Sequence, residues 1–446
     1  YALGMTYFMY ARKLEPTIEW IKEKFKKSEV LQVANIAALK AGFHFAETIE
    51  ISADAYTVPA AKIESGVYRQ ISGNQALAWG FIFASENSGL DLFLGSYPIT
   101  PASDILHELA KFKEFGVKTF QAEDEIAAIC AAVGASYTGA LSLTTSSGPG
   151  IALKSEALNL AIMLELPLVV VDVQRGGPST GLPTKTEQSD LFLTMFGRNG
   201  DSPAVVIAAS SPADCFNSAY EASKISVEHM TPVILLSDGY IANGSEPWKI
   251  PDVNTLPDME TRILKKKEGF APFNHGNPDL ARPWALPGTP GMEHRIGGLE
   301  KWEETGHVSY DPENHQKMVE LRQEKVDIIA RDLPPAKPFG KESGDLLVIG
   351  WGGTHGALRS AVETAQSEGM SVSHLHLRHL NPLPQNLGEI LVKFQKVMIA
   401  ELNLGQLANI IRAKFLVDAV GLNKVQGKPF TQTEVFNKIT ELVKGA

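Results

Sequence analysis

Short apolar runs alternate with segments of helical periodicity over most of the chain after residue 71. The apolar runs predict buried strands at residues 90–95, 117–121, 140–145, 167–173, 204–209 and 232–237. The periodic segments predict helices at residues 74–86, 102–113, 126–138 and 212–227, with a further helix opening at Gly148. Because strands and helices alternate over this length, we expect a doubly wound parallel α/β sheet across residues 71–249.

Residues 345–446 return to the same pattern and predict a second, smaller α/β domain. The expected elements are strands at 346–351, 372–377 and 396–400 and a helix at 357–368. Residues 250–344 are rich in proline, glycine and charge, and only residues 314–331 predict a helix there. We therefore expect an irregular inter-domain segment that ends in a linker.

The beginning of the chain has a different character. Residues 16–27 and 32–48 have helical spacing, so residues 1–50 predict two helices, which are too few for a separate core. Residues 51–70 mix proline, alanine and polar residues without a period, which indicates a linker. Because Tyr1 stands where a methionine is expected, we expect the sequence to begin partway through a longer polypeptide.

The stretch from Thr145 to Asp190 contains the most informative loops. Its first strand runs into the Gly148-Pro149-Gly150 turn, where absent side chains let a ligand approach the backbone and free amides attract anions. The strand at 167–173 is apolar apart from Asp172, which predicts burial on both faces. It leads into a polar loop that begins at Arg175.

Three loops carry candidate chemistry, at residues 97–101, 121–125 and 175–190. Each follows the carboxyl end of a predicted parallel strand. We therefore expect the three loops to share one rim of the sheet, which is where such sheets bind ligands.

Two acidic residues, Glu123 and Glu125, open the small-residue helix at 126–138. One reading is that they stabilise the positive end of the helix dipole. The other is that a carboxylate beside the nearly bare alanine face of this helix shares a proton with a heteroaromatic nitrogen, since a low dielectric strengthens such a hydrogen bond.

Arg175 also has two readings, because a guanidinium at the end of a buried strand needs a partner. It either pairs with a protein carboxylate such as Glu187 or Asp190, or binds the anion of a ligand. Asp172 is expected to bond nearby backbone amides. From the turn alone, the hydroxyl of Thr100 is expected to have a local structural role.

Composition narrows the functional classes. The 446 residues carry a net charge of −10, which argues against nucleic-acid binding. No apolar run reaches the roughly 18 residues that span a bilayer. Two cysteines, Cys130 and Cys215, are too few for an iron–sulfur cluster, so we expect no metal ligands here and a reducing, cytoplasmic setting. Ser146 and Ser147 lack a Gly-x-Ser-x-Gly context, which disfavours a hydrolase.

Five motifs together resemble one known family. They are the runs Tyr97–Ser103, Glu123–Glu125 with its small-residue helix, Thr145–Gly150, Gln174–Thr184 and Glu401–Leu407. In this order they resemble the α subunit of 2-oxoacid:ferredoxin oxidoreductases, with the 2-oxoglutarate branch as the nearest match. The resemblance runs from about residue 70 to the C-terminus. Residues 1–50 resemble the end of the family's γ domain, which some members fuse ahead of α.

The resemblance implies a thiamine diphosphate enzyme that decarboxylates a 2-oxoacid, transfers the acyl group to coenzyme A and passes two electrons to ferredoxin. Residues 71–249 would then be the pyrimidine-binding domain of the thiamine diphosphate fold. Residues 345–446 would resemble the C-terminal domain of transketolase.

The resemblance also implies roles for individual residues. Glu125 would bind N1′ of the aminopyrimidine, and the Gly148-Pro149-Gly150 turn would approach the cofactor. Thr100 would meet the substrate and Arg175 its carboxylate. The remaining candidates for substrate binding are Ser179, Thr180 and Lys185. A second carboxylate received by Lys185 would favour 2-oxoglutarate.

One departure from complete thiamine diphosphate enzymes bears on the partners. The nearest match to their GDG metal motif, Ser237-Asp238-Gly239, lacks the first glycine, and Asn243 follows too closely. We therefore expect a β subunit to carry Mg²⁺, the diphosphate and a [4Fe–4S] cluster, with the thiamine diphosphate shared between subunits in an (αβ)₂ assembly. The alternatives are a pyruvate or branched-chain 2-oxoacid enzyme, a ferredoxin-independent thiamine diphosphate enzyme, and a non-catalytic protein that keeps the fold.

Overall fold

The computed structural model describes residues 1–50, 56–266 and 268–445 and divides into two compact units, residues 1–66 and 67–446. Residues 51–55 of the expected linker lie outside the described part. Within the described ranges, no helix has the length and apolar character needed to cross a membrane.

The described residues of the first unit form three helices where the sequence predicted two. They are α1 (Ala2–Met9), α2 (Glu15–Lys24) and α3 (Glu29–Thr48). The added helix, α1, packs on α3 through Gly4, where a Cβ atom would lie 2.0 Å from the carbonyl oxygen of Leu39. A helix that packs through the backbone of a glycine needs no periodic apolar side chains at that contact. The spacing of apolar residues therefore does not reveal α1.

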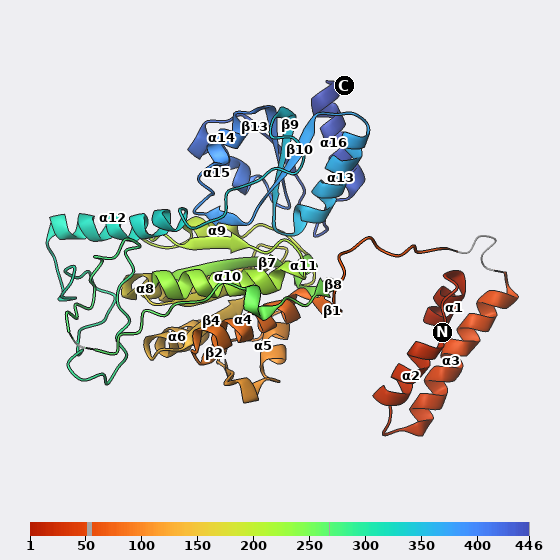
Figure 1. Cartoon of the computed structure of the whole chain (residues 1–446), viewed down its shortest axis with the longest axis horizontal. Coiled ribbons are helices and arrows are strands. Elements are labelled where there is room, and N and C mark those ends of the chain that lie inside the picture. Colours follow the sequence, from red (N-terminus) through yellow and green to blue (C-terminus); the bar gives the residue numbers. More distant parts are fainter. Residues whose placement is uncertain (51–55, 267, 446) are drawn as a thin grey trace. The chain divides into compact units, whose positions relative to one another are not determined.

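A seven-stranded sheet forms the centre of the second unit (Figure 1). Its strands are β2 (Leu92–Ser96), β3 (Lys118–Gln121), β4 (Leu141–Ser146), β5 (Leu168–Gln174), β6 (Val205–Ala208), β7 (Pro232–Asp238) and β11 (His379–Asn381). They lie in the order β11-β6-β7-β5-β4-β2-β3, and every pair is parallel except β11 with β6. Every residue of β5 is buried. The predicted parallel α/β fold is confirmed.

Helices cover both faces of this sheet. They are α4 (Gly73–Ser88), α5 (Ser103–Leu109), α6 (Glu125–Tyr137), α7 (Gly148–Leu153), α8 (Ser155–Leu164), α9 (Leu191–Phe196), α10 (Asp214–His229) and α11 (Gly239–Asn243). Val171 of β5 belongs to one apolar core with Phe81 of α4 and Phe216 of α10. Its neighbour Val170 belongs to a second core with Ile129 of α6. Successive strand residues point to opposite faces, which gives the sheet its two cores.

Two helix predictions need correction. The helix expected at 102–113 ends at Leu109 and is followed by a 3₁₀ turn at Lys113–Phe115. The helix expected after Gly148 is divided into α7 and α8 at Lys154. In both places apolar spacing continues past the point where the backbone changes direction, so periodicity overestimates the length.

The expected linker at 51–70 also needs correction, because it contains the start of a strand. β1 (Tyr68–Ser72) pairs antiparallel with β8 (Ser245–Lys249). Both segments are short and mostly polar, and they lie far apart in the sequence. Their hydrogen bonds come from tertiary contact, which a local pattern does not show.

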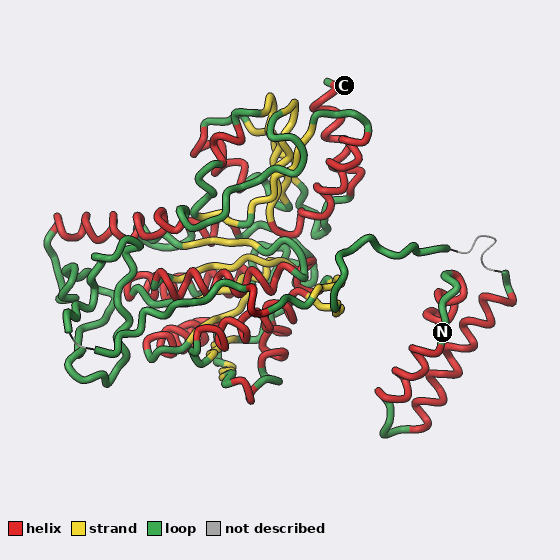
Figure 2. The backbone as a smooth tube through the Cα atoms, in the orientation of Figure 1, coloured by secondary structure: helices red, strands yellow, loops and turns green. Residues whose placement is uncertain are grey.

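A second sheet of four parallel strands lies in the C-terminal part, in the order β10-β9-β12-β13. Its strands are β9 (Gly344–Trp351), β10 (Val372–Leu377), β12 (Phe394–Glu401) and β13 (Ala419–Asn423). Its helices are α13 (His355–Ser367), α14 (Leu387–Leu391), α15 (Gln406–Phe415) and α16 (Gln432–Lys444), with a 3₁₀ turn at Gly352–Thr354. Figure 2 shows helices on both flanks of this sheet.

Residues 250–311 contain little regular structure, as the sequence predicts (Figure 2). They include a 3₁₀ turn at Val253–Thr255 and several isolated bridges. The segment then enters α12 (Pro312–Ile329), which confirms the helix predicted at 314–331 within two residues at each end.

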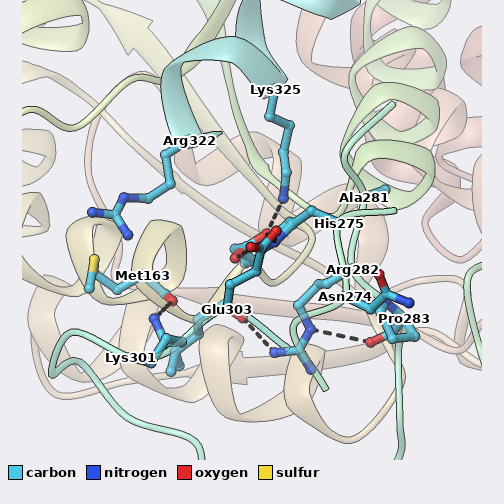
Figure 3. Close-up of polar contacts among 12 residues, drawn as sticks. Met163, Asn274, His275, Ala281, Arg282, Pro283, Lys301, Glu303, Arg322 and Lys325 are labelled. Carbon is cyan, nitrogen blue, oxygen red and sulfur yellow. Dashed lines mark hydrogen bonds and ion pairs between the residues drawn. The ribbon is translucent and has the colours of Figure 1, made fainter. Parts of the chain in front are cut away.

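A buried ionic cluster fastens this segment to the end of α8. Glu165 follows α8; its carboxylate contacts His275 Nε2 at 3.1 Å and pairs with Lys325 of α12. We call these three buried residues the Glu165 cluster. Figure 3 shows Lys325 extending from α12 toward His275. Burial alone would raise the pKa of the Glu165 carboxyl, but Lys325 and His275 hold it well below its usual range.

Two more buried cations bind the last carbonyl groups of α8 (Figure 3). Lys301 Nζ donates to the carbonyl oxygen of Met163 at 2.7 Å, and Arg282 Nη1 donates to that of Leu164 at 2.9 Å. The C-terminus of a helix carries partial negative charge, which cations stabilise. Ionic contacts therefore hold the irregular segment where regular secondary structure does not.

We expect Lys325→Met to lower the free energy of unfolding by about 3–5 kcal/mol, because removing one partner leaves the buried Glu165 charge poorly compensated. Urea denaturation followed by tryptophan fluorescence measures the change. The matched control is Lys317→Met on the same helix. Its lysine is 58% exposed and pairs with Glu303, so the loss should stay below about 1 kcal/mol. Equal losses in the two variants would contradict the role given to the Glu165 cluster.

Candidate functional site

The loops after β2, β3, β4 and β5 lie at one rim of the seven-stranded sheet, because these four strands are parallel and adjacent. The chain leaves β2 toward β3 on one side and then returns to β4 on the other. Such a reversal opens a crevice between the two loops that diverge. The predicted common rim is confirmed, and the reversal lies between the loop after Ser96 and the turn after Ser146.

Glu125 is the first residue of α6 and lies against the turn after β4. A Cβ atom on Gly150 would lie 2.9 Å from Glu125 Cγ and 3.1 Å from its Oε1, so the carboxylate rests against bare backbone. The helix cap is supplied by Asp124, whose side chain accepts the amide of Ala127 at 2.7 Å. The Glu125 carboxylate is therefore not needed as a cap, and Glu123 is exposed.

The turn opposite Glu125 has an unusual supply of polar groups. The hydroxyl groups of Ser146 and Ser147 are buried and lack a hydrogen-bond partner among the described residues. Ser146 Oγ would lie only 2.0 Å from a Cβ atom on Gly150. Glu125 and Ser146 thus both pack closely against Gly150, which brings a carboxylate and a hydroxyl without a described partner to the same glycine.

Arg175 follows β5 and is 7% exposed. Its Nη1 donates to the carbonyl oxygen of Thr100 at 2.7 Å, which joins the loops after β5 and β2. Its Nε is buried without a partner, and Arg175 forms no ion pair with any residue that the structure describes. Neither Glu187 nor Asp190 forms an ion pair with Arg175 in the described part of the chain, although the charge of Arg175 acts on the Asp190 carboxyl. A ligand anion as the partner of Arg175 stays a prediction.

The loop from Arg175 to Asp190 closes on itself. The Gly176 amide donates to the carbonyl oxygen of Lys185 at 2.9 Å, and the Leu182 amide donates to that of Gly176 at 2.7 Å. Arg175 lies buried at the base of this loop. The other predicted substrate ligands lie on its exposed part: Ser179, Thr180 and Lys185. The structure therefore brings Glu125, Thr100 and Arg175 to one rim and leaves these three side chains in solvent.

The C-terminal part holds this loop in place. The side chain of Gln188 accepts the amide of Leu402 at 3.0 Å and donates to the carbonyl oxygen of Trp351 at 2.7 Å. Gln406 Nε2 donates to the carbonyl oxygen of Ser189 at 2.7 Å. The run at 401–407, which the sequence singles out without a role, thus anchors the loop that carries Arg175.

Comparison with known proteins decides the family. A family model described as "Pyruvate flavodoxin/ferredoxin oxidoreductase, thiamine diP-bdg" matches residues 89–312. The 2-oxoglutarate oxidoreductase subunit KorA of Mycobacterium tuberculosis is 55% identical over 446 residues, which are 100% of this chain and 68% of that protein. The chain belongs to the 2-oxoacid:ferredoxin oxidoreductase α-subunit family.

Two further relatives agree. Subunit alpha of 2-oxoacid:ferredoxin oxidoreductase 1 from Aeropyrum pernix is 33% identical over 86% of the chain, which spans 62% of that relative. A solved structure of 2-oxoglutarate:ferredoxin oxidoreductase from Magnetococcus marinus, with 2-oxoglutarate, coenzyme A and succinyl-CoA bound, is 34% identical with a TM-score of 0.91. It matches 99% of this chain, which spans 77% of that structure's chain.

The family's description names thiamine diphosphate, and Glu125 is the residue predicted to meet the pyrimidine half of this cofactor. Its carboxylate lies beside a stretch of α6 whose outward residues Ala127 and Cys130 are small and exposed. Inward residues Ala128 and Ala132 are buried. Ile126, which lies between Glu125 and Ala127, is 48% exposed and is the one large side chain of this outward stretch.

The residues do not fit the metal that holds the diphosphate. Asp238, the nearest candidate, caps α11 by accepting two amides of that helix, and it also accepts from Thr186 Oγ1 at 2.8 Å and from the Gly353 amide at 3.2 Å. Its carboxylate is thus committed to joining three segments of the α subunit. Among the described residues, no group of three or more His, Cys, Asp or Glu could hold a metal ion.

Asp172 differs from its expected role as a partner of backbone amides. Both of its carboxyl oxygens are buried without a partner in the described part of the chain. Burial and the neighbouring Asp190 raise its pKa well above the usual range. Burial also raises the pKa of Asp190 to about 6, with Glu187 adding to the rise and Arg175 opposing it. At neutral pH the two carboxyl groups therefore keep one proton between them, which avoids two adjacent buried negative charges.

Lys154 is a buried residue that sequence analysis did not single out. It separates α7 from α8, is 1% exposed, and its Nζ donates to the carbonyl oxygen of Glu125 at 2.8 Å. A lone lysine within the apolar run that follows Gly150 is the signal that could have marked it.

We expect Gly150→Ala to displace Glu125 and Ser146, because the added methyl group has no room between them. Overpacking of this kind costs about 1–3 kcal/mol, so the melting temperature should fall. Differential scanning calorimetry measures the fall, and a crystal structure of the variant shows the moved carboxylate. Gly134→Ala in α6 is the control, because nothing lies within 4 Å of its added atom. A Gly150→Ala variant as stable as the control would refute the close contact.

Proposed function

We propose that the chain is the α subunit of a thiamine diphosphate-dependent 2-oxoglutarate:ferredoxin oxidoreductase, which converts 2-oxoglutarate and coenzyme A to succinyl-CoA and CO₂ and passes electrons to ferredoxin. The observation that carries the proposal is that two side chains lie at one rim: the Glu125 carboxylate, which rests against bare backbone, and the buried Arg175 guanidinium, whose Nε has no hydrogen-bond partner among the described residues. The names of the relatives from Mycobacterium tuberculosis and Magnetococcus marinus support 2-oxoglutarate as the substrate.

Glu125 has the role of holding a proton between its carboxyl group and N1′ of the aminopyrimidine. The cofactor, when bound, supplies the carbon nucleophile and the electron sink for decarboxylation. The Gly150 backbone limits the freedom of the carboxylate, which keeps it in place for this hydrogen bond.

Arg175 has the role of binding the carboxylate next to the oxo group. A planar guanidinium suits this task because it can donate two parallel hydrogen bonds to one carboxylate. Its bond to the Thr100 carbonyl oxygen fixes the side chain before substrate arrives and places Thr100 beside the same substrate. Ser179, Thr180 and Lys185 are exposed in this chain, and we propose that Lys185 receives the second carboxylate when the loop is covered.

A β subunit completes the active centre in this proposal. The chain supplies the pyrimidine side, while Asp238 is occupied by internal hydrogen bonds, so the diphosphate and Mg²⁺ fall to the partner. The [4Fe–4S] cluster that delivers electrons to ferredoxin belongs to the partner as well. An (αβ)₂ assembly and a cytoplasmic setting are part of the proposal; the free thiols of Cys130 and Cys215 are consistent with a reducing compartment.

Replacing Glu125 with Gln should lower succinyl-CoA formation by the complex on the order of 10²-fold or more, because an amide keeps the shape but cannot exchange the proton. The assay is ferredoxin reduction dependent on 2-oxoglutarate and coenzyme A, with the β subunit present. Glu123→Gln is the matched control two residues away and should retain the wild-type rate. Full activity in Glu125→Gln would overturn the catalytic role.

Two substitutions test how the substrate is bound. Arg175→Lys should raise KM about tenfold for 2-oxoglutarate and pyruvate alike, since both carry the carboxylate next to the oxo group.

Lys185→Met should raise KM for 2-oxoglutarate alone, because pyruvate has no second carboxylate. The measurement is ferredoxin reduction over a concentration series of each substrate. Faster turnover of pyruvate than of 2-oxoglutarate by the unmodified complex would replace the proposed substrate.

A further inference from the structure

The amine of Lys154 occupies a place that disfavours a cation. Its side chain is buried, and Nζ donates to the carbonyl oxygen of Glu125 at 2.8 Å. Glu125 is the first residue of α6, where the helix dipole is positive. A charge that is buried at such a position needs strong compensation.

The compensation comes from α6 and its cap. The titratable groups that act on Lys154 are Glu125, Asp124 and Cys130. Burial lowers the pKa of Lys154 to about 8, and Glu125 makes the largest opposing contribution, followed by Asp124. Both carboxylates therefore balance the charge of the amine, and Glu125 does so more strongly than Asp124.

Lys154 and Gly150 lie four residues apart, at the end and within the body of α7. Residues at this spacing share one face of a helix. Gly150 touches the side chain of Glu125, and Lys154 binds its main-chain carbonyl. One face of α7 therefore contacts both the side chain and the main chain of Glu125.

We propose that Lys154 is a positioning residue for Glu125: it fixes the first turn of α6, and its charge favours the ionised carboxylate. The proton shared with the cofactor then shifts toward N1′. This inference rests on the role proposed above for Glu125. The positive charge of Lys154, and not only its volume, then contributes to the reaction.

The test is hydrogen–deuterium exchange at C2 of thiamine diphosphate bound to the complete complex, followed by NMR from pH 6 to about 9.5. Lys154→Met keeps the bulk and removes the charge. Its exchange should be about tenfold slower than wild type at pH 6 to 7, because the positive charge that favours the ionised carboxylate is lost. Because the lowered pKa of Lys154 means that its charge is present below about pH 8 and lost above it, the two profiles should converge at higher pH.

Lys301→Met is the control for loss of a buried lysine. Lys301 also donates to a helix carbonyl oxygen, and burial lowers its pKa to about 8, but it lies at the far end of α8. Both methionine variants should melt earlier than wild type, and only Lys154→Met should alter exchange. If Lys154→Met does not assemble, Lys154→Arg decides, because its permanent charge should keep fast exchange below pH 8 and remove the change near pH 8.

Two outcomes separate this inference from the proposed function. If Glu125→Gln abolishes C2 exchange while the Lys154→Met profile overlies wild type, the inference fails and the function stands. If Glu125→Gln leaves exchange intact, the role of Glu125 fails first. A Lys154→Arg profile that still changes near pH 8 would also overturn the inference.

Discussion

Parallel pairing of β2, β3, β4 and β5 is the constraint on which the site depends. Parallel strands end at the same edge of a sheet, so the pairing of the strands alone brings residues that are far apart in the sequence to one rim. The all-buried β5 fixes the depth from which Arg175 emerges, and β4 fixes the Gly150 turn beside it. Glu125 then enters from α6 because that helix must return from β3 across β2 to β4. The crevice follows from the order of the strands.

The sequence predicts this framework well and its details unevenly. Buried strands such as β5 and β7 are apolar throughout, so their pattern is strong, and the loops that follow them could be placed at one rim. The roles of Glu125 and Arg175 are implied by motifs and stay proposals. Periodicity does not reveal α1, which packs through Gly4, or the pairing of β1 with β8, because neither depends on a local apolar pattern. The burial of Asp172 and Lys154 depends on segments that are distant in the sequence, so composition does not reveal it.

The C-terminal part contributes more to the site than its place in the sequence suggests. Its run at 401–407 donates hydrogen bonds to the side chain of Gln188 and to the carbonyl oxygen of Ser189. Glu401 in turn accepts the amides of Leu407 and Ala408 at the start of α15. Asp238 binds the Gly353 amide from the other direction. The loop that carries Arg175 is therefore held between two α/β sheets, and its geometry depends on both.

β11 gives this dependence a further consequence. Its residues, His379–Asn381, leave the C-terminal sheet and cover the edge of β6, whose four residues Val205–Ala208 are apolar and buried. A fragment cut after residue 344 would expose this apolar edge with its unpaired amides and carbonyl groups. Such edges template association with other strands. The larger sheet therefore needs the C-terminal part to complete its edge, and a fragment that contains the sheet without β11 would be prone to aggregate.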